Sequence, residues 1–183
     1  TMKAYADAWL GTSSPLGTDS VTLSPYLGFE SLRPALDAAT ANQRGTFVLA
    51  LTSNPEGKSV QHVGKAEDTG AVAKQVIAAA TAENTAQTWE RMGSCGLVVG
   101  ATVGEALKEL AIDLSTFNGP ILSPGYGAQG ASAEDLYRIF AGVESQVLVN
   151  SSRGVLSAGP QPADLARAAQ SARDDLVRAR GTS

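Results

Sequence analysis

Hydrophobic runs and helical hydrophobic patterns alternate along most of the chain. Met2, Tyr5, Ala6 and Trp9 fall at helical spacing, which predicts a first amphipathic helix. After a break at 11–17, short apolar runs predict strands at 20–24, 46–52, 96–100, 120–124 and 146–150. Further helices are predicted at 31–42, 69–91, 103–110, from Ser132 onward and at 162–178, with a loop at 54–68.

Three of these helices carry more detailed predictions. The helix at 69–91 should turn Val72, Val76 and Ala80 inward, with Thr69 as its cap. Ser132 followed by Asp135 is a variant of the capping box, ahead of apolar residues at helical spacing: Leu136, Ile139, Phe140 and Val143. The last helix should bury one side, made of Leu165, Ala169, Ala172 and Leu176.

The order of elements predicts an α/β fold with a parallel sheet, either doubly wound or closed as a barrel. Polar residues, glycine and proline recur where the strands end, which favours the barrel, because barrel enzymes build their sites there. No G-x-G-x-x-G helix start follows an early strand, so a dinucleotide fold lacks its main marker. Because a (β/α)8 TIM barrel needs eight strands, we expect residues 1–183 to be a single domain, the C-terminal part of such a barrel. It would supply about five βα units and a leading helix, with about three more units upstream of Thr1.

Composition and charge limit the classes of function that the chain could have. The net charge is −4 with 17% charged residues, so there is no broad positive field for nucleic acid, and any positive potential must be local. One cysteine, Cys95, excludes an internal disulfide, fits a reducing compartment and is expected to be a buried core residue. No apolar stretch reaches the length of a membrane span and no signal peptide core is present, which predicts a soluble, cytoplasmic protein. Metal-ligand spacing is also absent, and His62 is expected at the surface.

The most informative segment is 123–130, where three glycines follow a predicted strand. Backbone N–H groups in such a loop can approach an anion closely, and the helix that begins near Ser132 adds its positive end. One strand later, Arg153 supplies a guanidinium suited to phosphate. A tight turn and a solvated arginine would explain each half alone. Both halves at successive strand ends favour a phosphate site.

Several segments together resemble orotidine 5'-phosphate decarboxylases, above all the bacterial and actinobacterial subgroup. Residues 124–130 (PGYGAQG) and 152–153 resemble that family's phosphate-gripping elements. Residues 19–28, 52–57 and 98–102 match further segments in the same order, and 1–10 resembles the end of the third-strand motif and the helix that follows it.

The resemblance implies roles for individual residues. Arg153, the backbone amides of Ser152 and Arg153, and the Gln129 side chain would hold a 5'-phosphate. Ser53 would read the pyrimidine edge, and Pro124 would border the apolar pocket beside the departing carboxylate.

A residue from the other subunit and several pocket-lining residues complete the implied site. Thr1 would reach a ligand in the other subunit, because the family's sites are shared across a homodimer. Other residues at strand ends could line the pocket: Thr22, Tyr26, Asn54, Gly125 and Gly127.

The implied reaction converts orotidine 5'-monophosphate to uridine 5'-monophosphate and CO2 in de novo pyrimidine synthesis, without metal or organic cofactor. This carboxy-lyase chemistry would depend on an Asp/Lys cluster expected upstream of Thr1, so no catalytic residue is assigned within this chain, and the chain alone is expected to be inactive. Lys3 would be an exposed charge on the first helix.

Two alternatives stay open. The chain could be an incomplete fragment that binds nucleotide monophosphate, with a separate N-terminal fragment as partner. It could also belong to another phosphate-binding TIM-barrel decarboxylase or isomerase, although segments 24–26 and 52–55 argue against that.

Overall fold

The computed structural model describes residues 1–64, 70–127 and 130–180. Five strands are formed: β1 (Ser20–Leu23), β2 (Gly45–Leu51), β3 (Cys95–Val99), β4 (Ile121–Pro124) and β5 (Val147–Asn150). The α-helices are α1 (Met2–Leu10), α2 (Arg33–Ala41), α3 (Lys58–Gln61), α4 (Val72–Thr85), α5 (Gly104–Glu109), α6 (Ala133–Ile139), α7 (Ser152–Leu156) and α8 (Pro162–Arg180). Short 3-10 turns occupy Phe29–Leu32, Pro55–Gly57 and Glu144–Gln146. None of the described helices is both long enough and apolar enough to cross a membrane.

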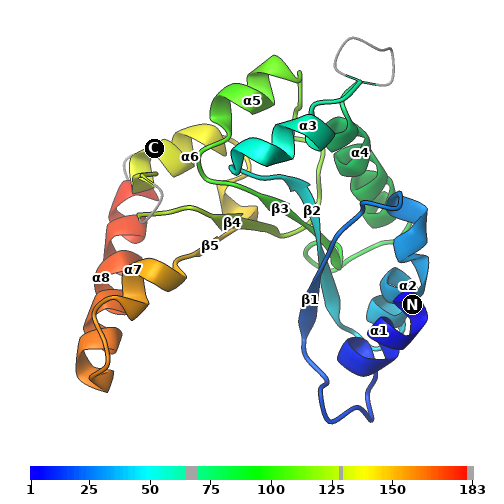
Figure 1. Cartoon of the computed structure of the whole chain (residues 1–183), viewed down its shortest axis with the longest axis horizontal. Helices are drawn as coiled ribbons and strands as arrows, with labels where there is room; N and C mark the ends of the chain where they lie inside the picture. The colour runs from blue at the N-terminus through cyan, green and yellow to red at the C-terminus, as the bar shows by residue number, and fades with distance from the viewer. Residues whose placement is uncertain (65–69, 128–129, 181–183) are drawn as a thin grey trace.

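All neighbouring strands pair in parallel, in the order β1-β2-β3-β4-β5. Each strand therefore lies beside its neighbour in the chain, with a helical connection between them, and the order never reverses as it does in a doubly wound sheet. In Figure 1 the helices form an arc from α8 through α5 to α1, with the strands on its inner side. The predicted α/β fold and parallel sheet are confirmed, in the arrangement of consecutive βα units of a barrel.

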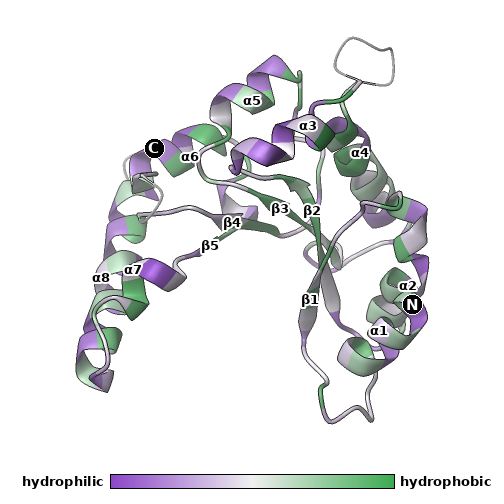
Figure 2. Cartoon of the chain, in the orientation of Figure 1, coloured by the Kyte–Doolittle hydropathy of each residue, from purple (hydrophilic) through white to green (hydrophobic). Residues whose placement is uncertain are grey.

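The core lies between the sheet and this arc of helices. All residues of the central strand β3 are buried, and Figure 2 shows hydrophobic colouring concentrated on β2 and β3. Cys95 is buried as predicted, and burial raises the pKa of its thiol to about 12, so it stays protonated. The inner face of the sheet is more open, since Leu148 on β5 is 51% exposed.

The structure corrects one predicted helix end and one predicted loop, and it adds a helix. Helix α4 ends at Thr85, short of residue 91, because the chain turns back there and the Trp89 indole donates to the Asn84 carbonyl. The expected loop at 54–68 contains a 3-10 turn and α3, and α7 was not predicted at all. Thr69, the predicted cap of α4, lies outside the described residues.

Side-chain predictions were better for the buried helices than for the exposed ones. On α6 and just after it, Leu136, Phe140 and Val143 are buried as predicted. On α8 the stripe is only half-buried, and Ala169 is exposed, which corrects that prediction. Tyr5 is also exposed on α1. Both errors fall on helices at the two ends of the arc, where fewer neighbouring elements cover the apolar stripe.

A buried asparagine joins the end of α4 to the start of β3. The Asn84 side chain donates to the Cys95 carbonyl (2.8 Å) and accepts from the Cys95 amide (3.1 Å). A Cβ atom at Gly93 would lie 2.0 Å from the Asn84 side-chain oxygen, and one at Gly119 would lie 2.5 Å from its nitrogen. Both glycines therefore leave room for this amide, which fixes where β3 begins.

The N-terminal cap of α6 is the capping box predicted at Ser132 and Asp135. The Ser132 hydroxyl accepts from the Asp135 amide (3.0 Å), and the Asp135 carboxylate accepts from the Ser132 amide (3.4 Å), so the predicted capping box is confirmed. We expect Ser132→Ala to lower the free energy of unfolding by about 1 kcal/mol, because one amide of the first turn loses its acceptor. Urea denaturation would measure this, and Ser157→Ala near the end of α7 is the matched control; equal stability of the two variants would contradict the capping role.

Candidate functional site

A hollow of about 170 Å³ lies where β4 and β5 end. The register pairs Pro124 with Asn150, so the segments after both strands leave the sheet side by side. The hollow is lined by Pro124, Gly125, Tyr126, Asn150, Ser151, Ser152 and Arg153. The two halves of the predicted phosphate motif thus meet in one place.

One wall of the hollow is made by Gly125 and Tyr126. They belong to the glycine loop, here the described residues 125–127 and 130–131. Gly125, Gly127 and Gly130 all have positive φ (113°, 70° and 89°), a conformation that side chains with a Cβ rarely adopt. The loop is tied by hydrogen bonds from Gly127 N–H to the Ala131 carbonyl (2.9 Å) and from Gly130 N–H to the Gly127 carbonyl (2.9 Å). A Cβ at Gly127 or Gly130 would meet no atom within 4 Å, so this backbone is open to a ligand.

The opposite wall is the first turn of α7, which begins at Ser152. N–H groups in the first turn of a helix have no acceptor within it, so those of Ser152 and Arg153 are available to an anion. Arg153 is exposed and, within the described part of the chain, enters no ion pair. The hollow therefore combines a fixed positive charge with backbone donors, a donor set suited to phosphate.

A second group of predicted residues lies further along the same edge of the sheet. Ser53 follows β2 and lies beside Gly100 at the end of β3, since a Cβ at Gly100 would be 3.4 Å from the Ser53 nitrogen. Ala101 N–H in turn donates to the Pro124 carbonyl (2.8 Å), which joins the ends of β3 and β4. Three strand spacings separate β2 from β5, roughly 14 Å. A ligand that reaches both ends must be elongated, with its anionic end over β4 and β5.

A hydrogen-bonded network that the sequence did not reveal holds the turn carrying Ser53. The Gln61 side chain, from α3, accepts from the Thr52 amide (2.9 Å) and donates to the Thr52 hydroxyl (2.7 Å). That hydroxyl also donates to the Asn54 side-chain oxygen. Asn54 thus supports the turn from within. The sequence signal for this network would have been Gln61 alone. A glutamine in a polar segment is common on protein surfaces, so it did not stand out.

Comparison with known proteins shows the family of this chain. A family model described as orotidine 5'-phosphate decarboxylase / HUMPS matches residues 1–169. The chain belongs to this family. The orotidine 5'-phosphate decarboxylase of Streptomyces coelicolor is 47% identical over 173 residues, and that of Salinispora arenicola is 50% identical over 169; each alignment covers 92% of this chain and 58% of the relative. The chain thus spans about three fifths of the length of these curated relatives.

Solved structures agree on the fold. A crystal structure from Streptomyces avermitilis, assigned as an orotidine 5'-phosphate decarboxylase, superposes with a TM-score of 0.83 at 46% identity, covering 97% of this chain and 60% of that one. Leishmania donovani OMP decarboxylase superposes with a TM-score of 0.72 at 25% identity, covering all of this chain and 64% of that one. The chain forms part of the (β/α)8 barrel of the orotidine 5'-phosphate decarboxylase family.

The structure brings some of the predicted residues together and leaves others apart. Pro124, Ser152 and Arg153 share the hollow with Gly125, while Gly127 follows in the glycine loop. Thr22 and Tyr26 lie on and after β1, at the far end of the sheet order, and both are exposed. Thr1 is at the start of α1, beside α2 in Figure 1 and away from α7. His62 is half-buried at the end of α3. Gln129 lies outside the described residues.

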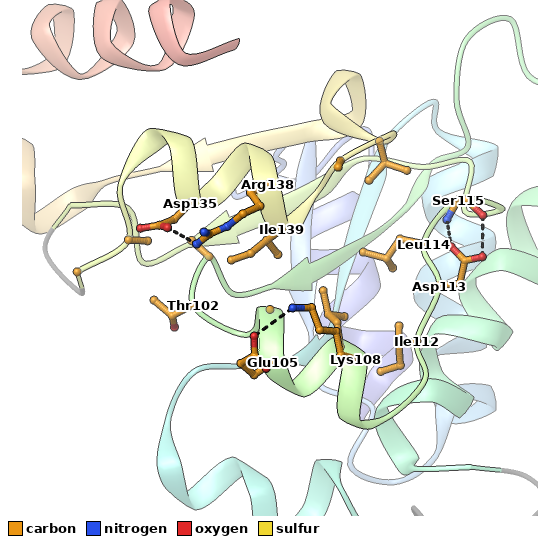
Figure 3. A pocket seen from close by; sticks show the side chains of 17 residues that line it. Thr102, Glu105, Lys108, Ile112, Asp113, Leu114, Ser115, Asp135, Arg138 and Ile139 are labelled. Atoms are coloured by element: carbon orange, nitrogen blue, oxygen red, sulfur yellow. Dashed lines mark hydrogen bonds and ion pairs between the residues drawn. The ribbon is translucent and has the colours of Figure 1, made fainter. Parts of the chain in front are cut away.

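A larger hollow of about 610 Å³ lies elsewhere, between α5 and α6 in the outer layer of helices. Figure 3 shows its charged side chains already matched: Lys108 pairs with Glu105 (3.2 Å) and Arg138 with Asp135. Asp113 accepts hydrogen bonds from Ser115 instead. These internal pairs leave neither cation of this groove uncompensated, so the smaller hollow is the better anion site.

Proposed function

We propose that the protein containing this chain is an orotidine 5'-phosphate decarboxylase, and that this chain binds the substrate's phosphate and pyrimidine. The observation that carries the proposal is the hollow where Arg153 and the glycine loop meet, with Ser53 on the same edge of the sheet. The phosphate of orotidine 5'-monophosphate would occupy the hollow, held by the Arg153 guanidinium and the amides of Ser152 and Arg153. The Ser53 end would receive the pyrimidine.

The contribution of these residues to catalysis would be differential binding. Contacts to the phosphate lie far from the carbon that loses CO2, so their binding energy can hold the base and its carboxylate in the reactive orientation. Pro124 would supply an apolar wall beside the departing carboxylate, a group that becomes neutral CO2. An apolar surface disfavours the charged substrate carboxylate and tolerates the neutral product. No residue of this chain is assigned to proton transfer.

The partners and setting of the proposed enzyme follow the family resemblance. We propose a homodimer in which Thr1 of one subunit approaches the ligand of the other, and a role in cytoplasmic pyrimidine synthesis. Gln129 would add a side-chain contact to the phosphate. Thr22, Tyr26 and Asn54 would line or support the pocket.

Ligand specificity tests this proposal. Uridine 5'-monophosphate at 100 times its Kd should stabilise the complete protein by about 2.7 kcal/mol, because it binds the folded state alone. Ribulose 5-phosphate at the same concentration should raise the melting temperature much less, since it lacks a pyrimidine for Ser53.

An activity assay completes the test. The complete protein should release CO2 from carboxyl-labelled orotidine 5'-monophosphate. Stabilisation by the sugar phosphate alone, without CO2 release, would favour a sugar-phosphate enzyme of the same barrel type and refute the proposal.

A further inference from the structure

Tyr126 connects the hollow to the last helix. Tyr126 lines the hollow, and its carbonyl accepts from the Ser151 hydroxyl (3.5 Å). Its phenol donates to the Asp175 carboxylate on α8 at 2.6 Å. A single residue therefore ties the glycine loop to a helix 49 positions along the chain.

The surroundings of this hydrogen bond strengthen it. Tyr126 is half-buried against the hydrophobic core, and a hydrogen bond to a carboxylate is about twice as strong as one between neutral groups. Burial, and next the bond to Asp175, raise the pKa of Tyr126 to about 12, so the phenol remains a donor throughout the neutral range. Arg178 lies 3.6 Å from the other oxygen of Asp175 and helps to keep that side chain in place.

The glycine loop needs such an anchor. Glycine loses more backbone freedom on ordering than any other residue, and three of the described loop residues are glycines with positive φ. Unless the loop is already ordered, a bound anion must supply the free energy of ordering it, which weakens binding. An attachment to α8 would remove part of that cost in advance.

We infer that Asp175 is a positioning residue, which acts through Tyr126 to hold the glycine loop in the shape that receives the ligand's phosphate. The inference rests on the proposed function for the identity of the ligand. Asp175 also lies beyond residues 1–169, the part of the chain that the family model matches. The anchor is made by the C-terminal helix α8, outside the hollow itself.

The experiment compares Tyr126→Phe, Asp175→Ala and the double variant with the wild-type complete protein. Each change should weaken binding of uridine 5'-monophosphate about tenfold, the low end of what losing a supporting hydrogen bond costs at metal sites. Affinity for uridine, which lacks the phosphate, should stay the same, and the double variant should be no weaker than either single one because both remove one interaction. Calorimetry measures all of these affinities.

A second readout needs no ligand. Hydrogen exchange at the amides of Gly127 and Gly130, both hydrogen-bonded within the loop, should accelerate in the two single variants. Asp174→Ala is the matched control, because Asp174 is the adjacent carboxylate and, among the described residues, pairs with its neighbour Arg173 at 2.7 Å. It should leave both readouts unchanged.

The outcomes separate the inference from the proposed function. Wild-type affinity and unchanged loop exchange in both variants would overturn the positioning role, and so would an equal loss for uridine, which would indicate general destabilisation. If the wild type binds uridine as tightly as its monophosphate, the proposed function fails. Loop exchange then decides alone whether Asp175 holds the loop.

Discussion

Replacing Arg153 with alanine is expected to lower kcat/KM for orotidine 5'-monophosphate by more than a hundredfold, about 3 kcal/mol of transition-state stabilisation. The guanidinium is the uncompensated cation of the hollow, and the charge-assisted hydrogen bonds that we propose it donates to phosphate have no substitute among the described side chains that line the hollow. Because phosphate binding also orients the base, kcat should fall together with affinity. Steady-state kinetics on the complete protein measures both parameters.

Arg167→Ala is the matched control for this prediction. Arg167 is exposed on α8 and pairs with Asp164 (3.0 Å), away from the hollow. It should leave kcat/KM within about twofold of wild type, as surface ion pairs contribute little. Arg153→Lys should recover only part of the loss, because an ammonium cannot form the paired hydrogen bonds of a guanidinium. Unchanged kinetics in Arg153→Ala would remove the phosphate assignment.

Asn84→Leu is expected to lower the free energy of unfolding by about 2 to 6 kcal/mol, the largest stability effect we predict. Leucine has the same branched arrangement of heavy atoms with larger methyl groups, so the substitution leaves no cavity. The amide and carbonyl of Cys95 would nevertheless lose their partner in a buried setting, at about 1 to 3 kcal/mol for each group. Chemical denaturation of the complete protein gives the difference in unfolding free energy.

Asn118→Leu provides the comparison, since Asn118 is an exposed asparagine in the segment that leads into β4. It should change stability by less than about 0.5 kcal/mol, as expected for surface substitutions. If Asn84→Leu changed the unfolding free energy as little, the hydrogen bonds between Asn84 on α4 and Cys95 on β3 would not determine where that strand begins.

The sheet could be predicted from the sequence because its strands are short apolar runs between turn residues, and all five were placed within one or two residues. The capping box at Ser132 was equally readable, because it is a local pattern with a local cause. Helix ends set by distant contacts were not. The residues 69–91 do not show that the chain stops being helical at Thr85, because Asn84 is held there by Cys95 at the start of β3.

The candidate site divides in the same way. The glycines of 125–130 and Arg153 were identifiable because they follow successive strands, and parallel strands end at one edge of a sheet. The supports of the site were hidden: Gln61 beneath the Ser53 turn and Asp175 behind Tyr126 are joined to their partners only by the fold. Polar side chains on exposed helices carry no sequence signal for such contacts.

The most direct test of the account is a crystal structure of the complete protein with uridine 5'-monophosphate. The phosphate should lie within hydrogen-bonding distance of the Arg153 guanidinium and the amides of Ser152 and Arg153, with the pyrimidine toward Ser53. A phosphate bound in the groove between α5 and α6, or a nucleotide that leaves Arg153 in solvent, would contradict it.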